Sequence, residues 1–286
     1  MNVDTPGIPE LGTVVHALGQ WQVDGTPLQL HPGDVGWYWR TGAAATAAAV
    51  RTWSRDGRIL AVGLLDGARQ LRLAIAPDAQ RDEALARQLV ADVGEPQRGV
   101  LPAGRVDIEA PAGAVLRDLL AEDGWDTGEP WTPPRRDLSD PVEDPGVRIE
   151  VAGPGTAPVR TAVHRSAFGS PSFTEGRWQA MASGLPYAHA RCLVAFDDAG
   201  QATASVTVWS AGAGRPGLLE PLGVAAGHRG RGFGRAITRA AAAALRDLGS
   251  SSAIVCTPSS NVGAVATYAS AGFVEGPAAP DLHRGA

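Results

Sequence analysis

The sequence predicts a mixed α/β fold in which two similar units follow one another along the chain. Strands alternate with helices in both halves, and the element order of the first half repeats the later part of the second. Gly124 follows Ile75 by 49 residues and Gly272 follows Val224 by 48, each glycine preceding an aromatic residue. Equal order at nearly equal spacing is typical of a duplicated unit, although two unrelated α/β domains can resemble each other by chance.

A proline-rich stretch marks the boundary between the two units. It contains Pro130, Pro133, Pro134, Pro141 and Pro145. Proline fixes its φ angle and has no backbone N–H, so this stretch excludes regular helix. We expect a first domain, a linker and a second domain at 1–140, 141–147 and 148–286. Residues up to Asp137 can still form a strand that pairs with Gly124–Asp126 across a turn at Thr127–Gly128.

Apolar periodicity places the elements of both halves. In the second half the expected strands are Val147–Val151, Arg191–Phe196, Ala202–Trp209, Leu218–Val224, Ser252–Cys256 and Gly272–Glu275. The expected helices there are Pro158–Phe168, Thr174–Met181 with Thr174 as N-cap, Gly232–Leu248 and Asn261–Ala271. The first half has expected strands at Ala48–Trp53, Arg58–Leu65, Gln70–Ile75 and Val106–Glu109, helices at Arg81–Asp92 and Ala112–Ala121, and a final strand opened by Gly124-Trp125. This order is that of a mixed-sheet α+β unit.

Composition restricts the classes of function. Hydrophobic residues make up 44% of the chain and charged residues 19%, as in soluble globular proteins. The net charge of −5 argues against a general nucleic-acid-binding protein, which needs a basic stripe. No apolar run reaches membrane-spanning length and Met1–Glu10 has no basic start, so we expect a cytoplasmic protein without membrane contact. Cys192 and Cys256 are too few for a disulfide framework, and Cys256 lies in an apolar run expected to bury it.

The most informative segment runs from Leu222 to Ile237, where a predicted strand enters a glycine-rich loop that opens a helix. Its glycines and arginines are Gly230, Gly232, Gly234, Arg229, Arg231 and Arg235. Glycine lets an anion approach the main chain closely. The free N–H groups at the start of a helix, aided by the helix dipole, favour a phosphate there. The segment therefore predicts a pyrophosphate site.

Several kinds of loop share these features, including a flexible Gly/Arg surface loop. A Walker loop needs a lysine, and this chain contains none. A dinucleotide-binding fingerprint needs Gly-x-Gly-x-x-Gly near the start of its domain, whereas Gly230-x-Gly232-x-Gly234 lies two-thirds along. The run Arg229-x-x-Gly232-x-Gly234 resembles the acyl-CoA loop of the GNAT N-acetyltransferase superfamily, Arg/Gln-x-x-Gly-x-Gly/Ala, at every position.

A second segment strengthens this resemblance. The residues from Asn261 to Phe273 are similar to the family's Asn-x-x-Ala-x-x-x-Tyr-x-x-x-Gly-Phe element. The matching positions are Asn261, Ala264, Tyr268, Gly272 and Phe273. The element also follows a predicted strand, as it does in the family. The double match covers the second half closely and implies a GNAT-type domain that uses acetyl-CoA.

The resemblance implies which residues bind acetyl-CoA. In the family the strand before the loop splays from its neighbour, and the pantetheine arm inserts between them. The backbone of Leu222, Gly223 and Val224 would pair with this arm, and Gly223 within a strand also indicates a close approach or a bulge. Asn261 would contact the arm or its neighbouring backbone, and it is equally well placed as a helix N-cap. The pyrophosphate would lie on main-chain amides of Arg229, Gly230, Arg231, Gly232, Phe233, Gly234 and Arg235.

Two side chains are candidates for the proton transfers. Tyr268 resembles the family tyrosine that protonates the departing CoA thiolate, a role that suits a weak acid with a pKa near 10. Its alternative role is a buried aromatic with a satisfied hydroxyl. Glu220 is the first candidate for the base, since it shares a strand face with Leu222, although several family members place the base at the position of Leu218. Further candidates for the base are His164 and His189. No His/Cys cluster has metal-ligand spacing and no Ser/His/Asp triad has its sequence context, so no metal is expected.

When the motif positions of the second half are transferred to the first half, other residues occupy them. Glu83 and Leu85 replace two loop glycines, Leu120 stands at the tyrosine position and Gly113 at the asparagine position. The carboxylate of Glu83 would lie where a phosphate should. We expect a degenerate GNAT-type domain that does not bind CoA productively, supports the active domain and walls part of the substrate cleft. Tandem GNAT proteins with one lapsed half, such as mycothiol synthase, are similar in outline.

The sequence thus predicts an N-acetyltransferase that transfers an acetyl group from acetyl-CoA to a primary amine in a ternary complex. The alternatives are a non-catalytic acyl-CoA-binding or regulatory module, and an acyltransferase that uses a larger acyl-CoA. An unidentified, small amine acceptor is expected near the loop between the first two helices of the second half and near Pro186–His189. Its lining candidates, which can equally be core residues, are Phe173, Trp178, Tyr187 and Trp209. The chain is expected to be a monomer or a homodimer.

Overall fold

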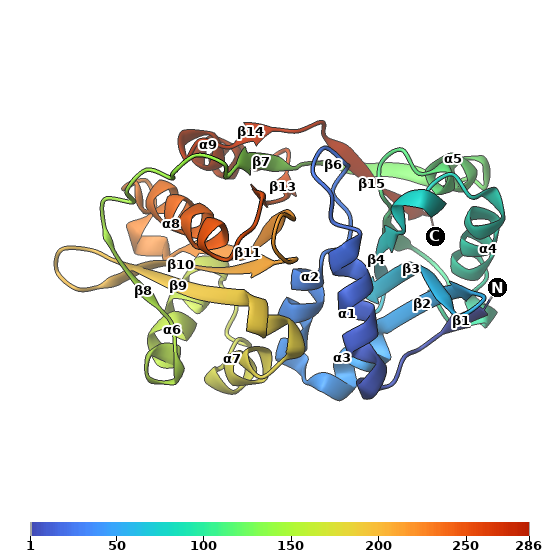
Figure 1. Ribbon diagram of the computed structural model, residues 1–286, viewed down its shortest axis with the longest axis horizontal. Coiled ribbons are helices and arrows are strands. Elements are labelled where there is room, and N and C mark those ends of the chain that lie inside the picture. The colour runs from blue at the N-terminus through green and yellow to red at the C-terminus, as the bar shows by residue number, and fades with distance from the viewer. Residues whose placement is uncertain (1, 286) are drawn as a thin grey trace.

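The computed structural model describes residues 2–285 and contains two mixed β-sheets with helices packed against each (Figure 1). The first sheet consists, in order, of β1 (Asn2–Asp4), β2 (Val50–Arg55), β3 (Arg58–Leu65), β4 (Gln70–Ile75), β5 (Val106–Glu109), β15 (Ala279–Arg284), β6 (Asp126–Thr132) and β13 (Thr257–Pro258). The second consists of β14 (Val274–Glu275), β7 (Pro134–Asp137), β12 (Ser252–Ile254), β11 (Gly217–Val224), β10 (Ala202–Ser210), β9 (Ala190–Phe196) and β8 (Arg148–Val151). Within residues 2–285, only β4–β5 and β11–β12 pair in parallel.

Helices lie in both halves, and several of them pack directly on the strands. The first half contains α1 (Leu11–Gln20), α2 (Pro32–Tyr38), α3 (Ala43–Ala49), α4 (Glu83–Gly94) and α5 (Val115–Glu122). The second contains α6 (Ala157–Phe168), α7 (Glu175–Ala182), α8 (Phe233–Asp247) and α9 (Val262–Ser270). In α8 one apolar face is fully buried, formed by Ile237, Ala241 and Leu245. Thr174 caps α7 as predicted, accepting a hydrogen bond from the Arg177 N–H at 3.2 Å. No helix within residues 2–285 is long and apolar enough to cross a membrane.

The two sheets exchange strands (Figure 1). β7 lies in the second sheet between β12 and β14, while β15 lies in the first sheet between β5 and β6. The expected pairing of residues up to Asp137 with Gly124–Asp126 is therefore wrong. β6 runs straight through Thr127–Gly128, and Pro133, which has no N–H to continue the ladder, separates it from β7. The division at 1–140, 141–147 and 148–286 stays a proposal, in which the first half contributes β7 to the second sheet and the second half contributes β13 and β15 to the first.

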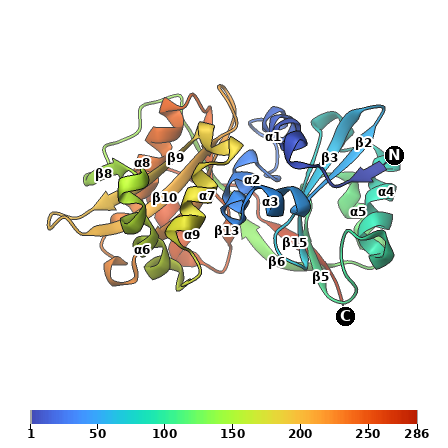
Figure 2. The same ribbon diagram turned by 90° about the horizontal axis from the view of Figure 1, so that it is seen from below.

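Helix α2 lies between the two sheets and packs on Trp209 of β10 (Figures 1 and 2). A Cβ at Gly33 would lie 2.6 Å from the Trp209 side chain, and one at Gly36 would lie 2.4 Å from the indole ring. The indole N–H donates to the carbonyl of Glu220 at 2.6 Å. His31, the N-cap of α2, accepts from the Gly33 N–H through Nδ1, so its Nε2–H donates to the Pro216 carbonyl at 3.2 Å. These contacts attach α2 to β10 and to the start of β11.

Replacing Gly36 by alanine should destabilise the protein by about 1–3 kcal/mol, because the new methyl group would overlap the Trp209 indole. This loss would outweigh the better helix propensity of alanine. The free energy of unfolding in urea measures the effect. Gly155→Ala is the control, since a Cβ there meets no atom within 4 Å, and it should change stability by less than about 0.5 kcal/mol. Equal stabilities of the two variants would contradict this packing.

Candidate functional site

Strands β11 and β12 pair at only two positions, Gly217 with Ala253 and Leu218 with Ile254. The chain after β12 then turns to the first sheet, where Thr257 pairs with Thr132 of β6. On its other side β11 stays paired with β10 as far as Val224, with a shift in register at Glu220 and Pro221. Within residues 2–285, the backbone from Leu219 to Val224 thus has one edge without a strand partner. The two strands splay as the sequence resemblance implied.

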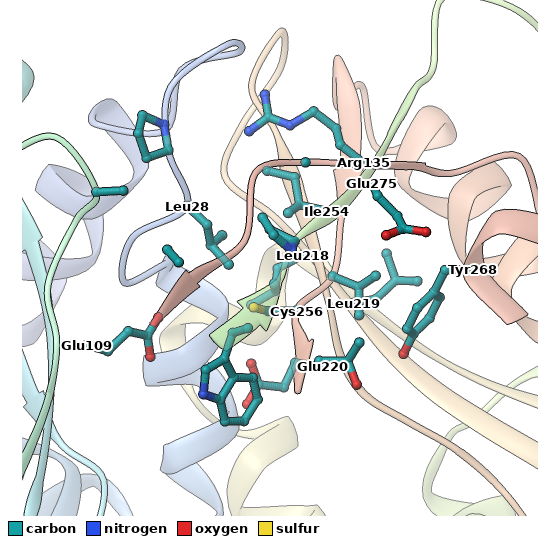
Figure 3. A pocket seen from close by; sticks show the side chains of 18 of the residues that line it. Leu28, Glu109, Arg135, Leu218, Leu219, Glu220, Ile254, Cys256, Tyr268 and Glu275 are labelled. Atoms are coloured by element: carbon teal, nitrogen blue, oxygen red, sulfur yellow. The ribbon is translucent and has the colours of Figure 1, made fainter. Parts of the chain in front are cut away.

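The splay opens into a cavity of about 1380 Å³ between the two halves (Figure 3). From the second half it is lined by Leu218, Glu220, Leu222, Ile254, Cys256, Asn261 and Tyr268. From the first half come Leu28, Asp34, Arg72, Glu109 and Trp131. Glu220 and Tyr268 both reach into this space (Figure 3). The structure therefore brings Glu220, Leu222, Asn261 and Tyr268 to one cavity.

The glycine-rich loop lies outside this cavity, at the start of α8. Gly230 and Gly232 have φ angles of 72° and 86°, a left-handed conformation that favours glycine. A Cβ at Gly234 would lie 2.9 Å from Thr267 of α9, so the start of α8 can lie this close to α9 only with glycine there. The first amides of α8 have no partners inside the helix, which leaves them available to an anion. The Arg229 guanidinium donates to the Ala167 carbonyl at 2.6 Å, so this side chain attaches the loop to α6.

Two further residues of the predicted acyl-CoA site have defined structural roles. A Cβ at Gly223 would lie 2.7 Å from the Cβ of Ala167, so the glycine makes room for α6 against β11. The irregularity in β11 lies at Glu220 and Pro221, and not at Gly223. Asn261 is the N-cap of α9, its side chain accepting from the Ala264 N–H at 3.2 Å. Contacts of Gly223, Val224 and Asn261 with pantetheine stay predictions.

Tyr268 has a buried ring and an available hydroxyl. The residue is 6% exposed, and burial, followed by the nearby Cys256 and Glu220, raises the pKa of Tyr268 to about 12. Its hydroxyl donates no hydrogen bond to any group within residues 2–285, and it lies on the cavity wall. Cys256 follows the end of β12, which stops at Ile254, and is half-buried. Burial also raises the pKa of Cys256 to about 12, which keeps this thiol protonated and unreactive.

Glu220 takes part in a buried charge cluster with three residues of the first half. Arg72 of β4 lies 2.9 Å from Asp34 of α2, 2.6 Å from Glu109 of β5 and 3.7 Å from the Glu220 carboxyl. Burial, and next the charge of Asp34, raise the pKa of Glu220 well above its usual range, while Arg72 opposes this shift. Sequence reasoning missed Asp34, Arg72 and Glu109. Alternation along β4 places Arg72 on the face opposite Leu71 and Leu73, where a charge normally indicates solvent.

The two histidines proposed as alternative bases lie outside the cavity. His164 is 5% exposed, with its ring centroid 4.6 Å from that of Phe168 and 4.3 Å from that of Phe173. Burial lowers the pKa of His164 to about 3. His189 is exposed at the end of the 3-10 helix η6 (Leu185–His189). Neither is therefore placed to act on a substrate in this cavity.

Of the two roles left open for the aromatic residues near Pro186–His189, acceptor lining or core, the structure shows the core. These candidates form a buried core, because α2 brings Trp37 against them, stacked 5.5 Å from Phe173. Phe173, Trp178 and Trp209 are 1–3% exposed, and Tyr187 packs on them. The open space lies instead between β11 and the first half.

In the first half a carboxylate, and not a glycine-rich loop, stands at the start of α4. Asp82 is the N-cap there, accepting from the Leu85 N–H at 2.9 Å and pairing with Arg55 at 2.7 Å. This carboxylate occupies the position where an anion would bind. Glu83, the residue expected to do so, instead pairs with Arg87 on the surface. Arg72 and Glu109, opposite each other in β4 and β5, also form an ion pair across the first half's parallel strands.

Comparison with known proteins finds one family model and several solved structures to which this chain is similar. The model of the acetyltransferase (GNAT) family matches residues 161–273. A GCN5-related N-acetyltransferase from Sphaerobacter thermophilus is 20% identical with a TM-score of 0.60, covering 99% of this chain and 95% of its own. A GNAT-family acetyltransferase from Colwellia psychrerythraea is 14% identical with a TM-score of 0.61, covering 99% and 98%. A tandem GNAT protein from the clavulanic acid biosynthesis pathway is 16% identical with a TM-score of 0.60, also covering 99% and 98%. No curated protein matches the sequence. These identities show the fold alone, and they confirm the predicted mixed α/β class.

Replacing Glu220 by glutamine should make stability less dependent on pH. Because the pKa of Glu220 is raised in the folded protein, the folded state binds this proton more tightly than the unfolded chain. The resulting stabilisation is fully present below the unfolded pKa of about 4.3 and is lost as pH rises through the raised pKa. The free energy of unfolding in urea should therefore rise for Glu220→Gln relative to the natural protein as pH increases. The total change should be about 1.4 kcal/mol for each unit by which folding raises the pKa of Glu220.

Glu275→Gln is the control for this measurement, because Glu275 is exposed. Its unfolding free energy should run parallel to that of the natural protein over the same pH range. A pH-independent difference between Glu220→Gln and the natural protein would show that Glu220 titrates normally.

Proposed function

We propose that the protein transfers the acetyl group of acetyl-CoA to a primary amine of a small molecule, because residues 161–273 match the model of the acetyltransferase (GNAT) family. The family uses acetyl-CoA, and the fold supports acyl transfer in general. One observation carries the proposal: the unpaired edge of β11, the Glu220 carboxyl and the Tyr268 hydroxyl meet at one cavity.

Two parts of the second half would hold acetyl-CoA. The main-chain amides of 229–235, at the start of α8, would bind the pyrophosphate, supported by the left-handed Gly230 and Gly232. The unpaired edge of β11 at Leu222–Val224 would pair with the pantetheine amides as an added strand does. The thioester end would then lie toward the cavity that Glu220 and Tyr268 line.

The charge of the cavity favours a cationic acceptor. Its lining includes eight Asp or Glu residues and three Arg residues. A primary amine with a pKa near 10 carries a positive charge at neutral pH, so this lining attracts it and repels anions. The volume of about 1380 Å³ is sufficient for a small molecule beside the acyl group.

Glu220 and Tyr268 would perform the two proton transfers. The Glu220 carboxylate takes a proton from the ammonium group, which frees the nitrogen lone pair for attack on the thioester carbonyl. As the C–N bond forms and the C–S bond breaks, Tyr268 gives its proton to the departing thiolate. Tyr268 keeps this proton at neutral pH, because its pKa is about 12. The same burial that raises this pKa makes a neighbouring thiolate more basic, which favours the transfer.

Replacing Tyr268 by phenylalanine should lower kcat about 10²-fold, because only the acidic hydroxyl is lost. Release of free CoA thiol from acetyl-CoA, with a panel of primary amines as acceptors, measures turnover. CoA affinity, measured by calorimetry, should stay the same. Tyr187→Phe is the matched control, since Tyr187 packs in the core beside Trp209 and should leave turnover intact. An active Tyr268→Phe enzyme would remove Tyr268 from the acid role.

Replacing Gly232 by glutamate should abolish CoA binding measured by calorimetry. The substitution strains a left-handed position and places a carboxylate next to the amides proposed to hold the pyrophosphate. Gly155→Glu adds the same charge in open space at a relaxed position and should bind CoA normally. Retained binding in Gly232→Glu would exclude this loop as the pyrophosphate site. Binding by the natural protein without turnover of any amine would favour a non-catalytic acyl-CoA-binding module.

A further inference from the structure

The charges around Glu220 come mainly from the other half of the chain. Resting on the proposed function, we propose that Asp34 and Arg72 are positioning residues that hold the Glu220 carboxyl and control when it releases its proton. The first half would then take part in the chemistry of the second, in addition to supporting it.

Arg72 is the centre of this arrangement. Its side chain, 14% exposed, lies among three carboxylates, with its Nη1 2.9 Å from Asp34 and 3.7 Å from Glu220, and its Nε 2.6 Å from Glu109. One guanidinium cannot neutralise three carboxylates. In a site with little water, the excess negative charge favours a proton on the carboxyl that Arg72 holds least closely, which is that of Glu220.

Asp34 is held as a fixed charge beside this carboxyl. Its side chain is 1% exposed; one oxygen accepts from the His31 N–H at 2.6 Å and the other faces Arg72. The helix that carries it cannot shift easily, since Gly33 and Gly36 lie against Trp209 and the His31 ring bonds to Pro216. Burial lowers the pKa of His31 to about 4, so the N-cap ring stays neutral and adds no charge.

The charged groups that face Glu220 act on its proton in two opposite directions. Asp34 and Glu109 favour its protonated form, and Arg72 favours its ionised form. Arg40, in the 3-10 helix η2 (Trp39–Thr41), interacts with the Glu220 charge from the α2 side. Cys256 and Tyr268 face it from the β12 and α9 sides and stay neutral at physiological pH. Asp34 and Arg72 make the largest charge contributions in the two directions, and both belong to the first half.

Because of this balance, the protonation of the Glu220 carboxyl depends on whether a cationic amine is bound. Without an acceptor, the raised pKa of Glu220 favours its protonated form. A cationic amine entering the cavity adds a positive charge beside Glu220, as Arg72 does, and favours loss of this proton to solvent. The resulting carboxylate can then take a proton from the bound ammonium group.

The test is the acid limb of the pH profile of kcat/KM, which reports the free enzyme. Asp34→Asn keeps an oxygen for the His31 N–H and removes a negative charge, so the limb should move to lower pH by about 1 unit. Arg72→Gln removes the opposing positive charge, so the limb should move to higher pH by about 1 unit. Arg72→Lys keeps the charge and should return the limb toward its natural position. Glu275→Gln, which removes a carboxylate elsewhere in the lining, should not move it.

Opposite shifts cannot come from general structural damage, which would lower kcat without moving the limb. If Asp34→Asn, in a folded protein, left the limb unmoved, the inference would be overturned. Carboxyl-13C NMR of glutamate-labelled protein, with Glu220 assigned by its loss in Glu220→Gln, follows the same titration without turnover. Opposite shifts of this titration in a protein that acetylates no amine would support the charge arrangement and reject the proposed function. Normal turnover with an unshifted titration would reject the inference alone.

Discussion

Hydrogen bonding between β11 and β12 ends at Leu218 and Ile254, and the form of the site follows from that limit. Both strands are held apart beyond it. β12 is drawn toward the first sheet through the pairing of Thr257 with β6, and β11 stays attached to β10. A buried strand edge without a partner leaves amide and carbonyl groups that a ligand can satisfy. The same separation leaves room for the cavity. The separation of β11 from β12 therefore explains both the unpaired edge of β11 and the cavity beside it.

The exchanged strands explain why this cavity lies between the halves. β7 completes the second sheet and β15 completes the first, so the chain crosses between the sheets more than once. Side chains reinforce these crossings. Arg136 donates to the Ala271 carbonyl at 2.5 Å, and Arg117 donates to that of Pro280 at 2.8 Å. The part of the cavity wall that the first half forms is thereby attached to the second half through the exchanged strands and through α2.

The first half has a mixed sheet as the second does, and a carboxylate caps the start of its helix α4. Asp82 occupies the helix start, and an ion pair between Arg72 and Glu109 joins its parallel strands. The same Arg72 reaches Glu220 across the interface. Charges of the first half thus take part in the electrostatics around Glu220. A buried network of this kind is costly unless its members are paired, which fits its fixed geometry around Arg72.

Local features of this protein could be predicted from the sequence. The strands Arg58–Leu65, Gln70–Ile75 and Val106–Glu109 have the bounds expected of them, and Thr174 and Asn261 cap their helices. Such features depend on residues within one or two turns of chain, where periodicity and capping act. The meeting of Asp34 and Arg72 with Glu220, the seat of α2 on Trp209 and the exchange of β7 and β15 were decided by the tertiary structure alone. They depend on which buried faces meet across the chain, and no local pattern specifies that.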